Sequence, residues 1–263
     1  MTPAARERAR VRTPLLLASA CAWAILLAGP GHSALLHGAH GAHPAHHAQP
    51  GPPAAPGDAP WAALALGWAI MLVAMMLPVL GAPVRHVQSR SLWSRRGRAV
   101  AAFLAGYGAV WMAAGVVLMA AALALRASPQ PRLAAGLAAT LVVAWQASPW
   151  KQGCFNRLHG HPALPAFGVR ADLGAAAFGV AHGFWCVGSC WGLMLLPMLS
   201  ASGHLAIMAL VSLWVWAEQL ERAAAAGWAL RVPLKAGRII LAQARLRSLR
   251  ARGASQGLLR NQR

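Results

Sequence analysis

This sequence is short of charge, and of acidic charge above all. Only 11% of its 263 residues are charged, and five Asp and Glu stand against 24 Lys and Arg. A soluble domain carries about 25% charged residues, so most of this chain cannot face water. Its 58% hydrophobic content is typical of a protein whose apolar runs match the thickness of a bilayer.

Cysteine is also scarce, which excludes a fold held together by a dense disulfide framework. The four cysteines are Cys21, Cys154, Cys186 and Cys190. The sequence lacks a nucleophile–base arrangement, a phosphate-binding glycine loop and a pair of catalytic carboxylates. We therefore expect a protein that is not an enzyme.

The net charge of +19 does not indicate a nucleic-acid partner. A nucleic-acid binder gathers its basic residues on one folded face, whereas here they form short clusters between apolar runs. That pattern orients membrane helices and attracts anionic lipid headgroups. The expected partner is the lipid bilayer.

Six apolar stretches predict an all-α, polytopic membrane bundle of about six transmembrane helices. They cover residues 14–28, 61–84, 100–125, 133–148, 172–199 and 204–230. The chain then divides into a first helix or cleavable signal-like segment (1–30), a His/Pro/Gly-rich outer loop (31–60), a five-helix membrane domain (61–230) and a basic cytoplasmic tail (231–263).

The basic residues also predict the orientation. With the N-terminus inside, 21 of the 24 Lys and Arg fall on the inner side and two, Arg126 and Arg132, on the outer side. The remaining one, Arg222, lies within the last expected span. The positive-inside rule therefore places both termini in the cytoplasm and the loop 31–60 outside. We expect a protein of the bacterial inner membrane.

The fifth expected span carries the pattern with the most chemical content. His182, Cys186, Cys190 and Met194 recur every four residues, a spacing that drifts by only about 40° per step on an α-helix. Imidazole, thiolate and thioether ligands favour Cu(I) or zinc over hard cations. Cys and Met also pack well in apolar helices, so core packing remains the alternative.

Two other spans offer weaker candidates. Met71 and Met75 share a helix face and suit thioether coordination of Cu(I), although structural packing is the favoured explanation for them. Glu218 and Glu221 also share a face. We expect Arg222 to neutralise Glu218, or this end of the helix to reach the surface, with a role in metal or proton handling as the alternative.

The outer loop 31–60 is rich in histidine, and such tracts bind divalent copper, nickel or zinc weakly. The loop is either a metal-capture tract or a low-complexity linker. Its histidines are His32, His37, His40, His43, His46 and His47.

Glycines in the fifth span indicate close helix packing; they are Gly179, Gly183, Gly188 and Gly192.

Three blocks of the chain resemble a family of metal-binding integral membrane proteins, the domain of unknown function 2182. They are Trp68-Ala-Ile-Met71-Leu-Val-Ala-Met75-Met76-Leu-Pro78, Trp145-Gln146-Ala-Ser-Pro149-Trp-Lys151-Gln-Gly-Cys154 and Gly183-Phe-Trp-Cys186-Val-Gly188-Ser189-Cys190-Trp191-Gly-Leu193-Met194. The resemblance covers roughly residues 61–225.

This resemblance implies copper handling, with Cys154, Cys186 and Cys190 matching the family's cysteines. Two departures lower the affinity expected for soft metals. Ser189 and Leu158 stand where the family has further cysteines, and His159 and His161 lie nearby as substitutes for Leu158.

The function expected from these observations is binding of a transition metal, copper before zinc, by an integral membrane protein. The expected ligands are Met71, Met75, Cys154, His182, Cys186, Cys190 and Met194. A metal-donor or metal-acceptor protein is the expected partner. The alternatives are a membrane scaffold or accessory subunit without metal, and a transporter, which the sparse charges within the spans disfavour.

Overall fold

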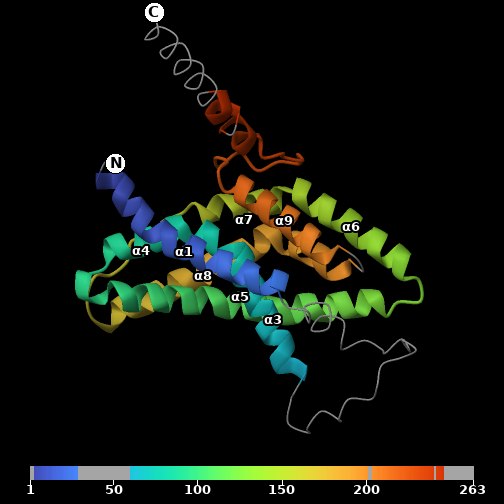
Figure 1. The fold of residues 1–263 in the computed structure, drawn as a ribbon, viewed down its shortest axis with the longest axis horizontal. Coiled ribbons are helices and arrows are strands. Elements are labelled where there is room, and N and C mark those ends of the chain that lie inside the picture. The colour runs from blue at the N-terminus through green and yellow to red at the C-terminus, as the bar shows by residue number, and fades with distance from the viewer. Residues whose placement is uncertain (1–2, 29–59, 201–202, 240, 246–263) are drawn as a thin grey trace, which may run out of the picture.

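The computed structural model describes residues 3–28, 60–200, 203–239 and 241–245, and its regular elements in these ranges are all helical. The all-α prediction is confirmed. The elements are α1 (Pro3–Ala28), α3 (Pro60–Met76), η1 (Leu77–Leu80), α4 (Gly81–Arg90), η2 (Trp93–Arg95), α5 (Arg96–Arg126), α6 (Pro131–Ala147), α7 (Pro149–Leu158), α8 (Gly168–Leu199) and α9 (His204–Glu218). Figure 1 shows their arrangement.

Four helical stretches are long and apolar enough to cross a membrane. They are Ala9–Ala28, Trp61–Arg90, Trp93–Arg126 and Gly168–Leu199. The pair α6 and α7 reaches this length only when taken together, and it bends by 60°. The described residues therefore hold four candidate spans, or five with the bent pair, where the sequence predicted about six.

Pro149 explains the bend between α6 and α7. A proline disfavours the helical conformation of the residue before it, and Ser148 is extended, with φ −76° and ψ 150°. The Ser148 hydroxyl then accepts a hydrogen bond from the backbone N–H of Lys151 at 3.2 Å and caps the new helix. The stretch from Lys151, expected to be a polar linker, is therefore a partly buried helix over its first eight residues.

The last expected span was predicted to reach residue 230, and this was wrong. α9 ends at Glu218, and its 15 residues cover only about 23 Å. The chain turns there because its polar groups find partners on α7. The Glu218 carboxylate pairs with Lys151, and Ala224 exchanges two hydrogen bonds with the Asn156 side chain.

The most extensive helix contact joins α5 and α8, which lie side by side in Figure 1. They run in the same direction, since Arg95 pairs with Asp172 at one end and Arg126 donates to the Met198 carbonyl at the other. A Cβ atom at Gly179 would overlap the backbone of Phe103, and one at Gly183 would press on Val110 and Tyr107.

The predicted close packing at these two glycines is confirmed. Gly188 and Gly192 also lie against neighbouring helices, meeting Cys154 and Val142 respectively. The absence of side chains at Gly179 and Gly183 lets the backbones of α5 and α8 approach each other.

The basic linkers predicted to share one side of the membrane do meet. His86, near the end of α4, bonds the Pro162 carbonyl at 2.8 Å, and Arg95 and Arg98 pair with Asp172 at the start of α8. The two linkers around residues 85–98 and 151–170 therefore lie at the same end of the bundle. Which side of a membrane this end faces stays a prediction.

Candidate metal centre

The four residues of the predicted stripe on α8 all lie inside the bundle. His182, Cys186, Cys190 and Met194 are each buried, as expected for polar and sulfur-bearing groups that face the interior rather than lipid. They share this face with the glycines that contact α5, so the backbone of α5 covers the first half of the stripe.

Cys186 has the most polar surroundings of the four. The hydroxyl of Tyr107 on α5 lies 3.4 Å from its Sγ atom, and the Cys190 thiol donates to the Cys186 carbonyl at 3.1 Å. The indole N–H of Trp111, one turn beyond Tyr107, is buried without a hydrogen-bond partner in the described part of the chain. The Tyr107 hydroxyl is therefore a polar group of α5 in direct contact with a thiol of α8.

Six methionines belong to the buried apolar cluster that also contains the two thiols. Met71 and Met75 of α3 are buried in the same continuous apolar cluster as Cys186, Cys190 and Met194. The cluster also includes three more methionines, Met76, Met198 and Met208. Thioethers adapt to irregular spaces and are soft ligands. These methionines can therefore fill the core and can also coordinate Cu(I).

Hydrogen bonds of tryptophan attach α3 to its neighbours. Trp68 donates from its indole to the Trp111 carbonyl on α5 at 2.9 Å, and Trp216 of α9 donates to the Met75 carbonyl at 2.6 Å. These two bonds hold the methionine-bearing helix α3 against α5 and α9.

His182 lies one helical turn before Cys186, nearer the end of the bundle where the basic linkers meet. Its ring packs within 6.0 Å, centroid to centroid, of Phe103, Tyr107 and Phe178. It also lines a cavity of about 440 Å³ together with His161. Partial burial, followed by the neighbouring His86, lowers the pKa of His161 and so favours its neutral ring.

Cys154, a predicted ligand, lies apart from Cys186 and Cys190. A Cβ at Gly188 would come within 2.7 Å of the Cys154 Sγ atom, so this thiol faces the Gly188 side of α8. Position 188 is about 200° around the helix from position 186. Within the described ranges, no three His, Cys, Asp or Glu side chains gather as a metal site. The predicted capture histidines, from His32 to His47, lie outside the described residues.

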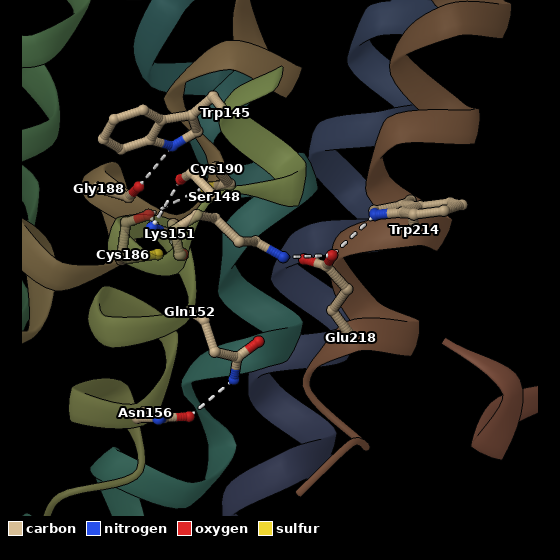
Figure 2. A network of polar contacts seen from close by, with 11 residues as sticks. Trp145, Ser148, Lys151, Gln152, Asn156, Cys186, Gly188, Cys190, Trp214 and Glu218 are labelled. Carbon is tan, nitrogen blue, oxygen red and sulfur yellow. Dashed lines mark hydrogen bonds and ion pairs between the residues drawn. The ribbon is translucent and has the colours of Figure 1, made fainter. Parts of the chain in front are cut away.

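A buried ion pair was missed by the sequence reasoning. The Lys151 ammonium lies 2.6 Å from Oε1 of Glu218, and the two side chains are 7% and 9% exposed. The indole N–H of Trp214 donates to the same oxygen at 2.9 Å (Figure 2). The predicted pairing of Glu218 with Arg222 was therefore wrong, as was the surface position. The available signal was that Lys151 comes soon after one apolar run and Glu218 ends another.

Figure 2 also shows how this ion pair adjoins the thiols. Lys151 and Ser148 begin α7, which packs on α8 at the level of Cys186 and Cys190, and Trp145 donates to the Gly188 carbonyl at 3.0 Å. The thiol-bearing segment of α8 thus has α5 on one side and the bend between α6 and α7 on another.

A comparison with protein families matches residues 65–241, more than half of the chain, to the PpoB2 family, described as a copper chaperone. The chain belongs to this family. The matched segment of this PpoB2 family member begins in α3 and includes every helix from α4 to α9. Comparisons with curated proteins and with solved structures gave no match.

Proposed function

We propose that this member of the copper chaperone family is an integral membrane protein that binds Cu(I) through Cys186 and Cys190 and passes it to another protein. The observation that carries the proposal is the pair of thiols one turn apart on α8, buried in a core rich in methionine. Thiolates and thioethers select Cu(I) among the common metals. Zinc is the second metal that thiolates would hold.

The arrangement suits a carrier better than an enzyme. Two thiolates from one helix leave the coordination of a bound ion incomplete, so an incoming ligand can attack it. Copper would move by ligand exchange, with Met194, Met71 and Met75 as weaker thioether ligands along the core. Binding to two thiols releases their protons, so affinity should rise with pH.

The proposed location is the inner membrane of a bacterium, with both termini in the cytoplasm. The length of four helices supports it, together with the asymmetric placement of Lys and Arg. A copper-donor or copper-acceptor protein is the partner that this role requires. The resemblance to the domain of unknown function 2182 spans nearly the same residues as the family match, and we infer that the two describe one group of proteins.

Metal analysis of protein purified anaerobically from copper-supplemented cells tests this proposal. We expect roughly one copper per chain in the wild type and a loss of this copper in Cys186→Ser/Cys190→Ser. Cys21→Ser/Cys154→Ser is the matched control, because it also removes two thiols and should keep the copper. Copper retained in the first variant would place the site elsewhere, with the histidines of the loop 31–60 as the next candidates.

A membrane scaffold without metal is the second candidate function. It is favoured by the absence of a group of three His, Cys, Asp or Glu within the described ranges, since Cys and Met then serve packing alone. In that case, neither the wild type nor any cysteine variant would hold copper, and adding Cu(I) would leave the thermal stability unchanged.

A further inference from the structure

A second cavity, of about 550 Å³, lies between α7, the end of α9 and the chain that follows α9. In Figure 1 this following segment, drawn in red, lies beyond the ends of α7 and α9. The buried pair of Lys151 and Glu218 lines the cavity. Because these two charges neutralise each other, the charge of the cavity is set by its other lining residues.

Those other residues make the cavity strongly positive. Four further cations line it, and only one further carboxylate, that of Glu221. Glu221 accepts a hydrogen bond from the backbone N–H of Lys235 at 2.7 Å. The four cations are Arg222, Arg231, Lys235 and Arg238. None of them forms an ion pair within the described ranges.

Hydrogen bonds hold the walls of this cavity in place. Asn156 of α7 donates to the Ala224 carbonyl at 2.8 Å and accepts from the Ala224 N–H at 3.2 Å. Further along, the Ala229 N–H donates to the Ala147 carbonyl at 2.9 Å, and Arg231 donates to the Ala225 carbonyl. The chain after α9 is thus fixed to the corner between α6 and α7, and the cations converge on a defined space.

The outer side of the same segment is apolar. Trp228 is 67% exposed and packs edge-on against Trp150, and Leu230, Val232 and Leu234 are also exposed. Val232 and Leu234 line the cavity as well. Tryptophan is enriched at the level of lipid headgroups. A basic space bordered by exposed tryptophan and aliphatic side chains matches a ligand with an anionic head and hydrocarbon chains.

We infer that this cavity binds the phosphate headgroup of an anionic phospholipid, whose acyl chains lie along Trp228, Leu230 and Val232. Basic pockets at the cytoplasmic ends of membrane helices are suited to such headgroups, and the planar guanidinium groups of Arg222, Arg231 and Arg238 match phosphate oxygens in pairs. This inference rests on the membrane location within the proposed function but does not depend on copper.

The test uses the full chain in detergent micelles, with lipid binding followed by native mass spectrometry and by thermal unfolding. Phosphatidylglycerol and phosphatidylcholine are added in separate titrations, and inorganic phosphate in a third. We expect tight binding of phosphatidylglycerol, weak binding of phosphatidylcholine and weak binding of phosphate alone. In Arg222→Gln/Arg231→Gln/Arg238→Gln, the affinity for phosphatidylglycerol should fall about a hundredfold, at roughly a factor of five per arginine near the lipid surface.

The matched control is Arg90→Gln/Arg132→Gln/Arg170→Gln, which removes the same charge from exposed positions outside the cavity. It should retain the wild-type affinity. Equal losses in both triple variants, or equal binding of the two lipids, would overturn the inference. If inorganic phosphate binds as tightly as phosphatidylglycerol, the acyl chains do not contribute to binding and the inferred lipid site is wrong. If the triple variant does not fold, Arg238→Gln alone tests the inference, and its affinity for phosphatidylglycerol should fall about fivefold.

Copper content, measured on the same preparations, separates this inference from the proposed function. If the wild type holds copper but binds the two lipids equally, the lipid inference fails and the proposed copper function stands. Loss of copper in the cysteine variant with lipid binding intact is the result expected if both proposals hold.

Discussion

The contact between α5 and α8 and the contact between α7 and α9 are both buried, but they are built from different groups. Along the middle of α5 and α8, glycines bring two backbones together, and the buried polar groups there include thiols, a tyrosine hydroxyl and an imidazole but no ion pair among the described residues. Between α7 and α9, a full ion pair bridges the helices, with a tryptophan N–H on its carboxylate.

This difference shows how one bundle can serve soft-metal chemistry and charge in adjacent regions. A thiol costs little to bury as a neutral group, so the α5–α8 contact can remain apolar until a metal arrives. A charged pair is costly to desolvate unless further hydrogen bonds satisfy its polar atoms, and Trp214 supplies one such bond to the Glu218 carboxylate. We therefore expect substitutions to have quite different effects in the two regions.

The largest effect is expected at the ion pair. Lys151→Met leaves the buried Glu218 carboxylate without its counter-charge, which should lower the free energy of unfolding by about 3–5 kcal/mol. The double variant Lys151→Met/Glu218→Gln should recover most of that loss. The free energies of unfolding of both variants are measured in the same detergent, with Arg90→Gln as the control at an exposed position. Equal losses of stability in the single and double variants would show that Lys151 stabilises the fold by something other than its ion pair with Glu218.

The glycine contact should respond next. In Gly179→Leu, the new side chain meets the backbone of Phe103, which cannot move aside as a flexible side chain does. We expect a loss of about 1–3 kcal/mol, the usual cost of overpacking. Gly136→Ala in α6 is the matched control, because a Cβ there meets nothing, and it should stabilise the helix by about 0.5–1 kcal/mol. A neutral Gly179→Leu would mean that α5 and α8 are not in close contact.

A smaller effect is expected where α3 is attached to α5. Trp68→Phe removes the indole hydrogen bond to the Trp111 carbonyl while keeping an aromatic ring, and it should cost about 1 kcal/mol. The same change at Trp93, which is 77% exposed, should have almost no effect. Thermal unfolding of the two variants side by side gives the comparison, and equal shifts would argue against a specific role for the Trp68 bond.

The smallest effect is expected at the end of the bundle, where Arg95 and Arg98 pair with Asp172. The Arg98 side chain is 65% exposed, and without it Asp172 keeps its partner Arg95. An exposed charge contributes little and is screened by salt, so Arg98→Gln should shift the unfolding temperature less than any variant in the core. The shift should shrink further at high salt. A shift that grows with salt would show that this cluster acts through something other than its charges.

Much of the fold follows from the length and spacing of apolar residues. Runs such as 100–125 match bilayer thickness and predicted α5, and the four-residue spacing from His182 to Met194 predicted a buried stripe on one helix. The early end of α9 was not predictable in this way, because it depends on Lys151, which lies 67 positions away in sequence. The position of Cys154 on the Gly188 side of α8 depends on the bend at Pro149, which periodicity alone does not describe.

The most direct test of the central claim is X-ray absorption at the copper edge on the purified, copper-loaded protein. If Cys186 and Cys190 bind Cu(I), the spectrum should show a Cu(I) edge and sulfur neighbours, and Cys186→Ser/Cys190→Ser should lose the sulfur signal. A wild-type spectrum with only nitrogen or oxygen neighbours would contradict a thiolate site on α8.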